Sequence, residues 1–310
     1  IMKKTKVWIT GANGMVGQSL SRNLMHKINY DVLKTTRKDF DQTNQLKTKN
    51  WIIKNKPDVI IITSALVGGI QLNSKIPADF LYKNSIIALN IIQAAHNANC
   101  KKIVFLGASC MYPKKAKQPF DENSILEGKV EETNEGYAIS KILGLKFIQL
   151  LNDQHNSKHI SIIPTASYGP NDCYDETKNH VIPALIKKIY DAKKNNKKKI
   201  TLWGSGLAKR EFIHVDDMAN GIIHILENYK EKTPINLGTG EEVTIKKLAN
   251  TISKIIGYNG EIIFDKTKPD GVKRKILSNE KIKKIKWKNK ITLKIGLEMA
   301  YQEYLKTIKS

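Results

Sequence analysis

A tyrosine and a lysine four positions apart, Tyr137 and Lys141, could form an acid–base pair. On a helix, this spacing places both side chains on the same face. A phenol has a reference pKa of about 10, and an ammonium group close to it favours the phenolate and lowers that pKa. Such a pair could protonate an oxygen while a hydride arrives at the carbon that carries it. The spacing therefore predicts that Tyr137 exchanges a proton and that Lys141 tunes it.

A glycine-rich turn near the start of the chain predicts a dinucleotide site. Residues 6–10 form a short apolar run typical of a strand, and a helical pattern continues after the turn to Leu24. Glycines in such a turn let the backbone approach a pyrophosphate, which binds the free N–H groups at the start of the helix. The predicted cofactor contacts of this turn are Gly11, Asn13, Gly14, Met15, Val16 and Gly17.

The end of the next predicted strand indicates which dinucleotide is bound. Residues 31–36 are predicted to form this strand, and Arg37 follows it. A site for NAD carries an acidic residue here for the ribose diol, whereas an arginine suits a 2′-phosphate. We therefore expect NADPH as the cofactor.

Apolar runs that alternate with helical patterns predict an α/β fold. The runs at 58–63, 102–106 and 160–164 are typical of buried parallel strands, and a helical stretch at 78–98 lies between two of them. This alternation predicts a doubly wound parallel Rossmann sheet. The pattern loosens after residue 170, which predicts a smaller, interleaved C-terminal domain that binds the substrate.

We expect the two domains to share the chain as follows. The Rossmann domain comprises residues 1–170, with residues 212–240 returning to it, and includes a short strand at 236–238. The smaller domain comprises residues 171–211 and 241–310. Within it, helical patterns occur at 181–194 and 244–256, a strand pattern occurs at 261–264, and helices are expected near the end of the chain.

The composition argues against several classes of protein. With 41% hydrophobic residues among 310, the chain can bury a sizeable core. No apolar run approaches the roughly 18 residues of a membrane span. The three cysteines, Cys100, Cys110 and Cys173, are widely spaced and suggest neither a disulfide framework nor a metal site. We expect a cytoplasmic protein with no membrane partner.

The net charge of +23 raises the possibility of a nucleic-acid partner. However, only four of the 52 basic residues are arginines, and the lysine runs lack interleaved aromatic residues. Lysine runs of this kind are typical of solvated loops. We therefore expect no nucleic-acid partner.

Longer motifs follow one another in the second half of the chain. Together with the glycine turn and the Tyr137–Lys141 pair, they resemble the extended short-chain dehydrogenase/reductases, and within them the GDP-L-fucose synthase group. The resemblance covers nearly the whole chain. The motifs are at residues 109–114, 179–185, 203–206, 210–218 and 268–271.

The resemblance implies roles for individual residues. Tyr137 would be the acid of the reductase, and Lys141 would also contact the nicotinamide ribose. Cys110 and His180 match the pair that epimerises C3 and C5. The chemistry fits this role, because a 4-ketone acidifies the hydrogens on the neighbouring carbons. Without the resemblance, Cys110 would be read as a buried hydrophobic residue and His180 as a surface residue. Pro164 and His180 are further implied cofactor contacts. The implied substrate contacts are Val181, Lys188, Trp203, Arg210, Arg274 and Lys275.

The chain departs from the family pattern at two positions. Where the family has a catalytic serine or threonine, this chain has Ala108. Ser109 is the next candidate, although on extended backbone its side chain would point the other way, and a water could also replace the hydroxyl. Loss of such a donor costs about 2.7–4 kcal/mol in an oxyanion-type site. After the strand at 160–164, Ala166 stands where the family has an asparagine. Either drift or a pocket remodelled for a bulkier sugar, such as a 4-keto-heptose, explains both changes.

The resemblance thus implies an NADPH-dependent C4 reductase of a GDP-linked 4-keto sugar, in the GDP-L-fucose synthase type together with C3/C5 epimerisation, in polysaccharide biosynthesis. It also implies a homodimer. A reductase without epimerase activity is an open alternative. A nucleotide-sugar epimerase or dehydratase that holds NAD is disfavoured by Arg37. A non-enzymatic protein that senses the cofactor or binds nucleic acid is disfavoured because Tyr137, Lys141, Cys110 and His180 are all retained.

Overall fold

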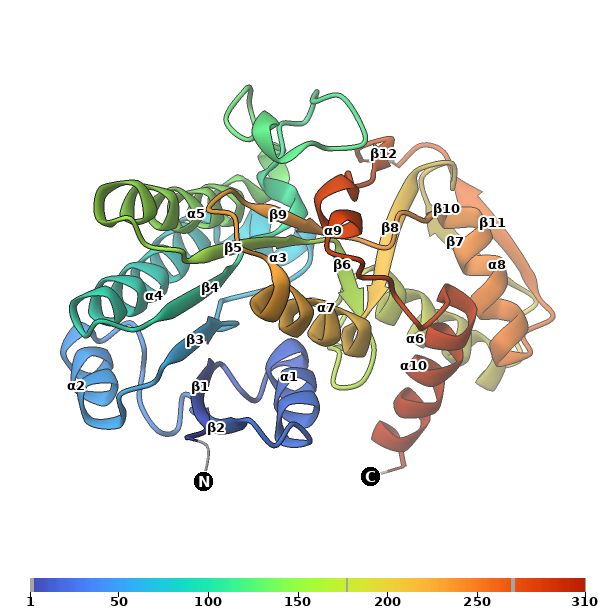
Figure 1. Cartoon of the computed structure of the whole chain (residues 1–310). Helices are drawn as coiled ribbons and strands as arrows, with labels where there is room; N and C mark the ends of the chain where they lie inside the picture. Colours follow the sequence, from blue (N-terminus) through green and yellow to red (C-terminus); the bar gives the residue numbers. More distant parts are fainter. Residues whose placement is uncertain (1–2, 177, 269–270, 310) are drawn as a thin grey trace.

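The larger part of the protein is built on a six-stranded sheet in which all neighbouring strands run parallel. The structure is a computed structural model, and it describes residues 3–176, 178–268 and 271–309. The sheet has the order β2-β1-β3-β4-β5-β9 (Figure 1). Its strands are β1 (Thr5–Thr10), β2 (Tyr30–Lys34), β3 (Val59–Ile62), β4 (Lys102–Leu106), β5 (Ile160–Pro164) and β9 (Ile235–Leu237). The predicted doubly wound parallel sheet is confirmed.

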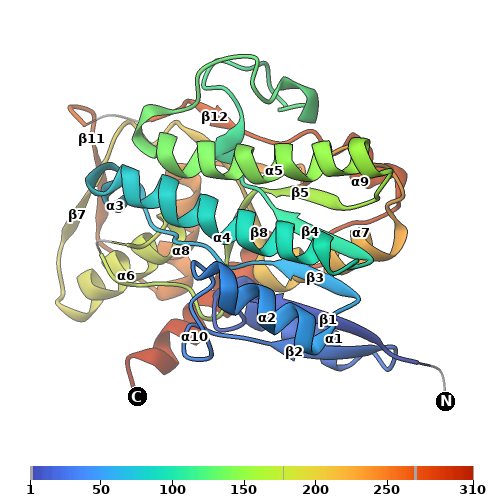
Figure 2. The same ribbon diagram turned by 90° about the vertical axis from the view of Figure 1, so that its left-hand side faces the viewer.

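Helices cover both faces of this sheet. On one face lie α2 (Gln45–Asn55), α4 (Pro77–Asn97) and α5 (Glu135–His155), which Figure 2 shows side by side. On the other face lie α1 (Met15–Met25) and α7 (Val215–Asn228). Successive residues of a strand point to opposite faces, so Trp8 joins the first core and Val7 the second.

Helix α5 lies very close to β4 because of a glycine. A Cβ atom added to Gly144 would lie 2.3 Å from the Phe105 Cζ atom, so only a glycine fits there without movement. At the start of α5, a Cβ atom on Gly136 would lie 2.3 Å from the carbonyl oxygen of Pro77, at the start of α4. These two contacts fix the position of the helix that carries Tyr137 and Lys141.

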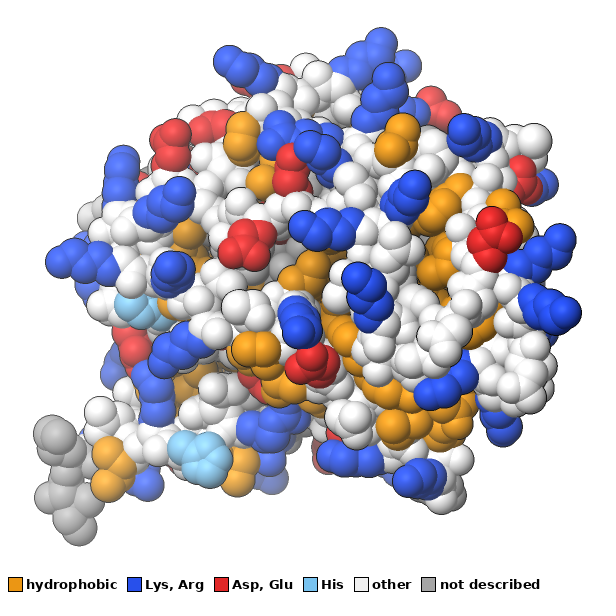
Figure 3. Space-filling view, turned by 90° about the vertical axis from the view of Figure 1, so that its right-hand side faces the viewer, with side chains coloured by type: hydrophobic (Ala, Val, Ile, Leu, Met, Phe, Trp, Pro, Cys, Tyr) orange, Lys and Arg blue, Asp and Glu red, His pale blue; other side chains and the backbone are white. Residues whose placement is uncertain are grey.

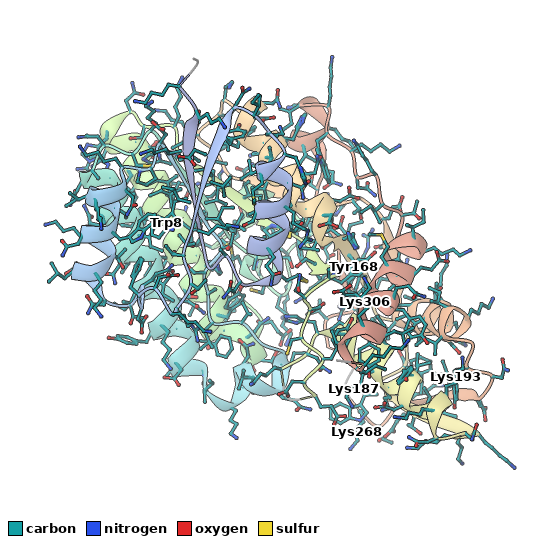
Figure 4. All side chains as sticks on the ribbon, turned by 90° about the horizontal axis from the view of Figure 1, so that it is seen from below. Trp8, Tyr168, Lys187, Lys193, Lys268 and Lys306 are labelled. Atoms are coloured by element: carbon teal, nitrogen blue, oxygen red, sulfur yellow. The ribbon has the colours of Figure 1, made fainter. Side chains whose placement is uncertain are left out.

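The smaller part has its own sheets and its own core. Strand β8 lies between β10 and β12 and also pairs with β6, while β7 and β11 form a two-stranded sheet. Figure 4 places Trp8 within the larger part and Tyr168 at the junction, and Tyr168 packs with the core of the smaller part. Its elements are β6 (Ala166–Tyr168), α6 (Val181–Lys194), β7 (Lys199–Trp203), β8 (Lys209–His214), β10 (Glu242–Thr244), α8 (Ile245–Ile256), β11 (Glu261–Asp265), β12 (Arg274–Lys275) and α10 (Leu293–Thr307).

The two parts are interleaved along the chain. Strand β8 belongs to the smaller part, and the chain then returns to the larger sheet through α7 and β9. The predicted domain boundaries remain a prediction. Helices α3 (Ile70–Lys75) and α9 (Glu280–Lys284) are the remaining α-helices of the described residues, and neither α2 nor α3 was expected from the sequence. Pro269 and Asp270 of the motif at 268–271 lie outside the described residues.

Neither a membrane helix nor a metal cluster is present among the described residues. No helix there combines the length and the apolar character needed to cross a membrane. Likewise, no group of three or more His, Cys, Asp or Glu side chains there is placed to hold a metal ion. Figure 3 shows that Lys and Arg side chains are scattered over the face of the smaller part.

We predict that Gly144→Ala destabilises the protein by about 1–3 kcal/mol, because the added methyl group overpacks the contact with Phe105. Urea unfolding followed by circular dichroism would measure the change. Asp153→Ala, on the exposed side of the same helix, is the matched control and should change stability by less than about 0.5 kcal/mol. Equal stability of the two variants would contradict the close approach of α5 to β4.

Candidate active site

A cavity of about 810 Å³ lies at the carboxyl ends of the parallel strands, between the two parts of the protein. Strand β1 pairs with β2 on one side and with β3 on the other, so the order of the strands reverses between β1 and β3. Open α/β sheets bind their ligands at such a point. The smaller part contributes Arg210, Phe212 and Lys275 to the cavity wall.

The glycine turn forms one end of the cavity and fits a pyrophosphate. Gly11 has a positive φ of 62°, and a Cβ atom on it would lie 2.8 Å from the Cα atom of Ser64. A Cβ atom on Gly17 would lie 2.5 Å from the carbonyl oxygen of Gly11. Gly14 is the N-cap of α1 and has no side chain to occupy the first N–H groups of the helix. These groups are therefore available to an anion.

The residues after β2 favour a phosphate over a ribose diol. Arg37 and Lys38 line the cavity. The carboxylate of Asp39 accepts hydrogen bonds from the backbone N–H of Thr36, at 2.7 Å, and from its hydroxyl, at 3.0 Å. These bonds lower the pKa of Asp39 and engage the carboxylate within the turn. The positive charges of Arg37 and Lys38, beside an Asp39 carboxylate that is already hydrogen-bonded to Thr36, suit the 2′-phosphate of NADPH.

Lys141 lies deep in the cavity and is held by the backbone. Its side chain is buried, and its Nζ atom donates a hydrogen bond of 2.8 Å to the carbonyl oxygen of Leu106, at the end of β4. The Nζ atom lies 5.6 Å from the centre of the Tyr137 ring and 5.1 Å from that of Phe105. Burial lowers the pKa of Lys141 to about 8, because the charged form loses hydration.

The pKa of Tyr137 is raised, so the predicted lowering is wrong for the protein without ligands. Burial is the main cause, and the nearby Cys110 thiol adds to it. Desolvation outweighs the attraction between Lys141 and a phenolate, because burial also lowers the pKa of Lys141 and disfavours its charged form. The phenol therefore stays protonated over the physiological range, which is the form that can donate a proton.

Cys110 and His180 line the same cavity as Tyr137. Cys110 lies in the short turn Ser109–Met111, and burial raises the pKa of its thiol to about 11, although Lys275 and Lys141 oppose the shift. His180 is the N-cap of α6, and desolvation lowers its pKa. At neutral pH, the cavity thus presents a protonated thiol and a neutral imidazole.

Both departures from the family pattern also lie at the cavity. Ala108 and Ala166 line its wall. Ala108 has extended backbone, with φ −159° and ψ 151°, whereas Ser109 begins a 3₁₀ turn. The expectation that Ser109 lies on extended backbone and faces away is wrong, because the turn brings Ser109 to the cavity wall.

The structure brings together every predicted cofactor contact and half of the predicted substrate contacts. Pro164, His180 and the glycine turn line the cavity, and so do Val181, Arg210 and Lys275.

Lys188, Trp203 and Arg274 are absent from the described wall of the cavity. Lys188 donates a hydrogen bond of 2.7 Å to the carbonyl oxygen of Thr201. Arg274 donates one of 2.6 Å to Glu242, and the Trp203 side chain is 64% exposed. Their role as substrate contacts stays a prediction.

The segment at 63–70 is a part of the cavity wall that the sequence analysis missed. The amide of Asn84 holds it by accepting a hydrogen bond of 2.6 Å from the N–H of Leu66 and donating one of 3.0 Å to its carbonyl oxygen. The N–H of Gly69 donates to the carbonyl oxygen of Lys178, at 3.0 Å. The sequence signal that could have identified this segment is its position directly after β3, because the carboxyl ends of parallel strands meet at one edge of the sheet.

Comparisons with known proteins agree with this site. The model of the NAD dependent epimerase/dehydratase family matches residues 7–238 of the chain. A GDP-L-fucose synthase of Escherichia coli strain K12 is 40% identical to the chain, and the match covers 98% of this chain and 98% of the relative.

Two solved structures are similar over nearly the whole chain. A GDP-6-OMe-4-keto-L-xylo-heptose reductase from C. jejuni has a TM-score of 0.91 at 30% identity, with 99% of each chain covered. A GDP-mannoheptose C4 reductase from Campylobacter jejuni with NADP bound has a TM-score of 0.89 at 31% identity, with 98% of this chain and 99% of that chain covered. The chain therefore belongs to the NAD dependent epimerase/dehydratase family, among the extended short-chain dehydrogenase/reductases, and it is similar to the GDP-L-fucose synthases.

Proposed function

We propose that the protein is an NADPH-dependent oxidoreductase that reduces the C4 ketone of a GDP-linked 4-keto sugar. The observation that carries this proposal is that one cavity contains the glycine turn, the Tyr137–Lys141 pair and the cations Arg210 and Lys275. The relatives named above act on GDP-linked sugars according to their names, and one structure holds NADP.

The chain offers a contact for each part of the cofactor. The turn from Gly11 to Gly17 would hold the pyrophosphate, and Arg37 would hold the 2′-phosphate. Lys141 would contact the nicotinamide ribose. When bound, NADPH supplies the hydride that reduces C4.

Tyr137 would donate the proton that the reduced oxygen needs. Its raised pKa keeps the phenol protonated until the reaction draws on it. Once the proton has left, the charged Lys141 stabilises the phenolate, because an ammonium favours a nearby anion. Lys141 is charged below its pKa of about 8.

Arg210 and Lys275 would bind the diphosphate of the substrate. They lie opposite each other in the parallel pair of β8 and β12, and both line the cavity. Glu211, the neighbour of Arg210, holds the two strands together by accepting a hydrogen bond of 3.0 Å from the N–H of Leu277. Two cations on paired strands suit two neighbouring phosphates.

Cys110 and His180 would epimerise the sugar before reduction. One of them takes a proton from the carbon beside the ketone, which breaks the C–H bond and leaves an enolate. The other returns a proton to the opposite face of that carbon. Both residues line the cavity that holds Tyr137, as such a sequence of steps requires.

A reductase that acts on a bulkier sugar without epimerisation is the second candidate. Ala108 and Ala166 support it, because both line the cavity and both are shorter than the polar residues of the family pattern. The similar structures from Campylobacter jejuni are named as reductases of GDP-linked heptoses.

The proposal includes a homodimer that works in the cytoplasm and supplies polysaccharide biosynthesis. Helices α4 and α5 lie side by side at the surface (Figure 2) and carry exposed apolar side chains. These are Leu81, Tyr82, Ile139 and Leu150. A shared face of this kind suits a second copy of the chain. The free thiols of Cys100, Cys110 and Cys173 fit a reducing compartment.

The direct test is the oxidation of NADPH with GDP-4-keto-6-deoxy-mannose in deuterated water, with the product analysed by mass spectrometry and NMR. We expect turnover with deuterium at C3 and C5, because Cys110 and His180 exchange protons with the solvent. Tyr137→Phe, which removes only the hydroxyl, is the matched control and should bind NADPH without turnover.

The other outcomes separate the two candidates. Turnover without deuterium at C3 and C5 would leave a reductase alone and contradict the epimerase step. If only a GDP-linked 4-keto-heptose is reduced, the second candidate is correct. NADPH binding without reduction of either sugar would contradict the proposed function.

We predict that Ala108→Ser raises kcat/KM for GDP-4-keto-6-deoxy-mannose by about tenfold or more, since it returns a hydroxyl to the cavity wall. The upper limit is about 10²–10³, the effect of one oxyanion donor. Ala98→Ser adds a hydroxyl at the exposed end of α4 and serves as the control. An unchanged rate in Ala108→Ser would show that Ser109 or a water already supplies this donor.

A further inference from the structure

Gly69 is a glycine at a position where the backbone conformation does not require one. Its φ of −67° and ψ of 178° are open to residues that carry a side chain. A close approach excludes the side chain instead, because a Cβ atom on Gly69 would lie 2.5 Å from the carbonyl oxygen of Asn179. The N–H of Gly69 also donates a hydrogen bond of 3.0 Å to the carbonyl oxygen of Lys178. We call this contact of Gly69 with Lys178 and Asn179 the Gly69 bridge.

The Gly69 bridge joins the two parts of the protein at the cavity. Gly69 follows β3 of the larger part, whereas Lys178 and Asn179 lead into α6 of the smaller part. Gly69 and His180, the residue directly after the bridge, both line the cavity. A direct backbone contact between the two parts is therefore located next to His180.

Asn73 fixes the larger part's side of the bridge. Its side chain is 6% exposed, and its amide donates hydrogen bonds to the carbonyl oxygens of Gly68, at 2.7 Å, and Gly69, at 3.1 Å. The carbonyl of Gly68 and the N–H of Gly69 belong to one planar peptide group and point in opposite directions. By holding that carbonyl, Asn73 directs the N–H of Gly69 toward Lys178.

Helix α3, which carries Asn73, also contacts the segment that leads to Tyr137. It packs against the short turn Glu132–Asn134, which directly precedes α5. The Ser74 hydroxyl donates a hydrogen bond of 3.5 Å to the carbonyl oxygen of Thr133 in this turn. The bridge is therefore anchored next to the start of the helix that carries Tyr137.

Hydrogen bonds on the smaller part's side hold the backbone before and after His180. The N–H groups of Lys178 and Asn179 donate to the carbonyl oxygen of Asp175, at 3.0 and 2.8 Å. After them, the N–H of Ala184 in α6 donates to the carbonyl oxygen of His180, at 3.0 Å. With the backbone held on both sides, a displacement at the bridge is passed on to His180.

We propose that Gly69 is a positioning residue for His180, whose place relative to Tyr137 it sets through its hydrogen bond to Lys178. Tyr137 belongs to the larger part and His180 to the smaller part, yet each has to reach its own atom of one sugar ring. The bridge fixes the distance between the two side chains, because it links the parts next to His180. Such precision matters, since a misplacement of about 1 Å can cost about 10²-fold in rate.

The inference rests on the proposed epimerase step for its role in catalysis, but its first test uses neither sugar nor cofactor. Failure of the inference can thus be told apart from failure of the proposed function. The probe is the imidazole of His180 itself, in protein that carries isotope-labelled histidine. Its NMR signals would be followed over pH and identified by their loss in His180→Asn.

We expect Gly69→Ala to change the NMR signals of His180 and to raise the pKa of its imidazole toward the ordinary value of about 6.5. The added methyl group pushes the backbone at 178–179 away, which returns water to the ring. Asn73→Ala frees the peptide group before Gly69 and should act in the same direction, so it serves if Gly69→Ala does not fold. Gln71→Ala, at an exposed position of the same helix, is the matched control and should leave His180 unchanged.

Signals and a titration of His180 in Gly69→Ala that match those of the parent would overturn the proposal. An equal change in Gln71→Ala would also overturn it, because any change in α3 would then have the same effect. Circular dichroism would confirm that each variant folds.

A second measurement connects the bridge to catalysis. Deuterium exchange into C3 and C5 of GDP-4-keto-6-deoxy-mannose should fall by about 10²-fold in Gly69→Ala, since His180 is displaced from the carbon it serves. Exchange at the parent's rate would overturn the positioning role. No exchange in the parent would contradict the proposed epimerase step, whereas the NMR titration still decides whether Gly69 positions His180.

Discussion

The hydrogen bond from Lys141 Nζ to the carbonyl oxygen of Leu106 is the interaction on which the site depends. It joins α5 to the carboxyl end of β4 in a place from which water is largely excluded. Gly144, on the same helix, leaves the room that lets α5 lie against Phe105. Once Lys141 is held, Tyr137 one helical turn earlier faces the same cavity.

Burial sets the resting state of the cavity. It raises the pKa of Tyr137 and Cys110, and it lowers the pKa of Lys141, His180 and Lys275. In each case the neutral form gains, because a charge loses hydration in the interior. A neutral phenol is ready to donate a proton.

Local patterns in the sequence predict the sheet and the cofactor end of the site. Period and composition identify the strands, and the glycine spacing identifies the turn at Gly11, because these features depend on a few neighbouring residues. The direction of the pKa shift of Tyr137 could not be predicted in this way, because desolvation depends on every segment around the cavity. The Tyr137–Lys141 spacing alone suggested that the pKa of Tyr137 would be lowered.

The substrate end also depends on contacts between distant segments. Adjacent residues of a strand face opposite ways, so Lys275 reaches the cavity and Arg274 turns to Glu242. Which of the two faces inward depends on how β12 pairs with β8. The sequence analysis named both residues as substrate contacts, because the sequence does not show which one faces inward. The position of Ser109 likewise depends on a single short turn after β4.

The pH dependence of kcat/KM for NADPH-dependent reduction, from about pH 6 to about pH 10, tests the central claim most directly. The account holds that Tyr137 acts as a protonated acid and that Lys141, with a pKa of about 8, must be charged. The rate should therefore be level below that pH and should fall above it, by about tenfold for each further pH unit. A rate that rises with pH through neutrality would show that the phenolate is the active form and would contradict the account.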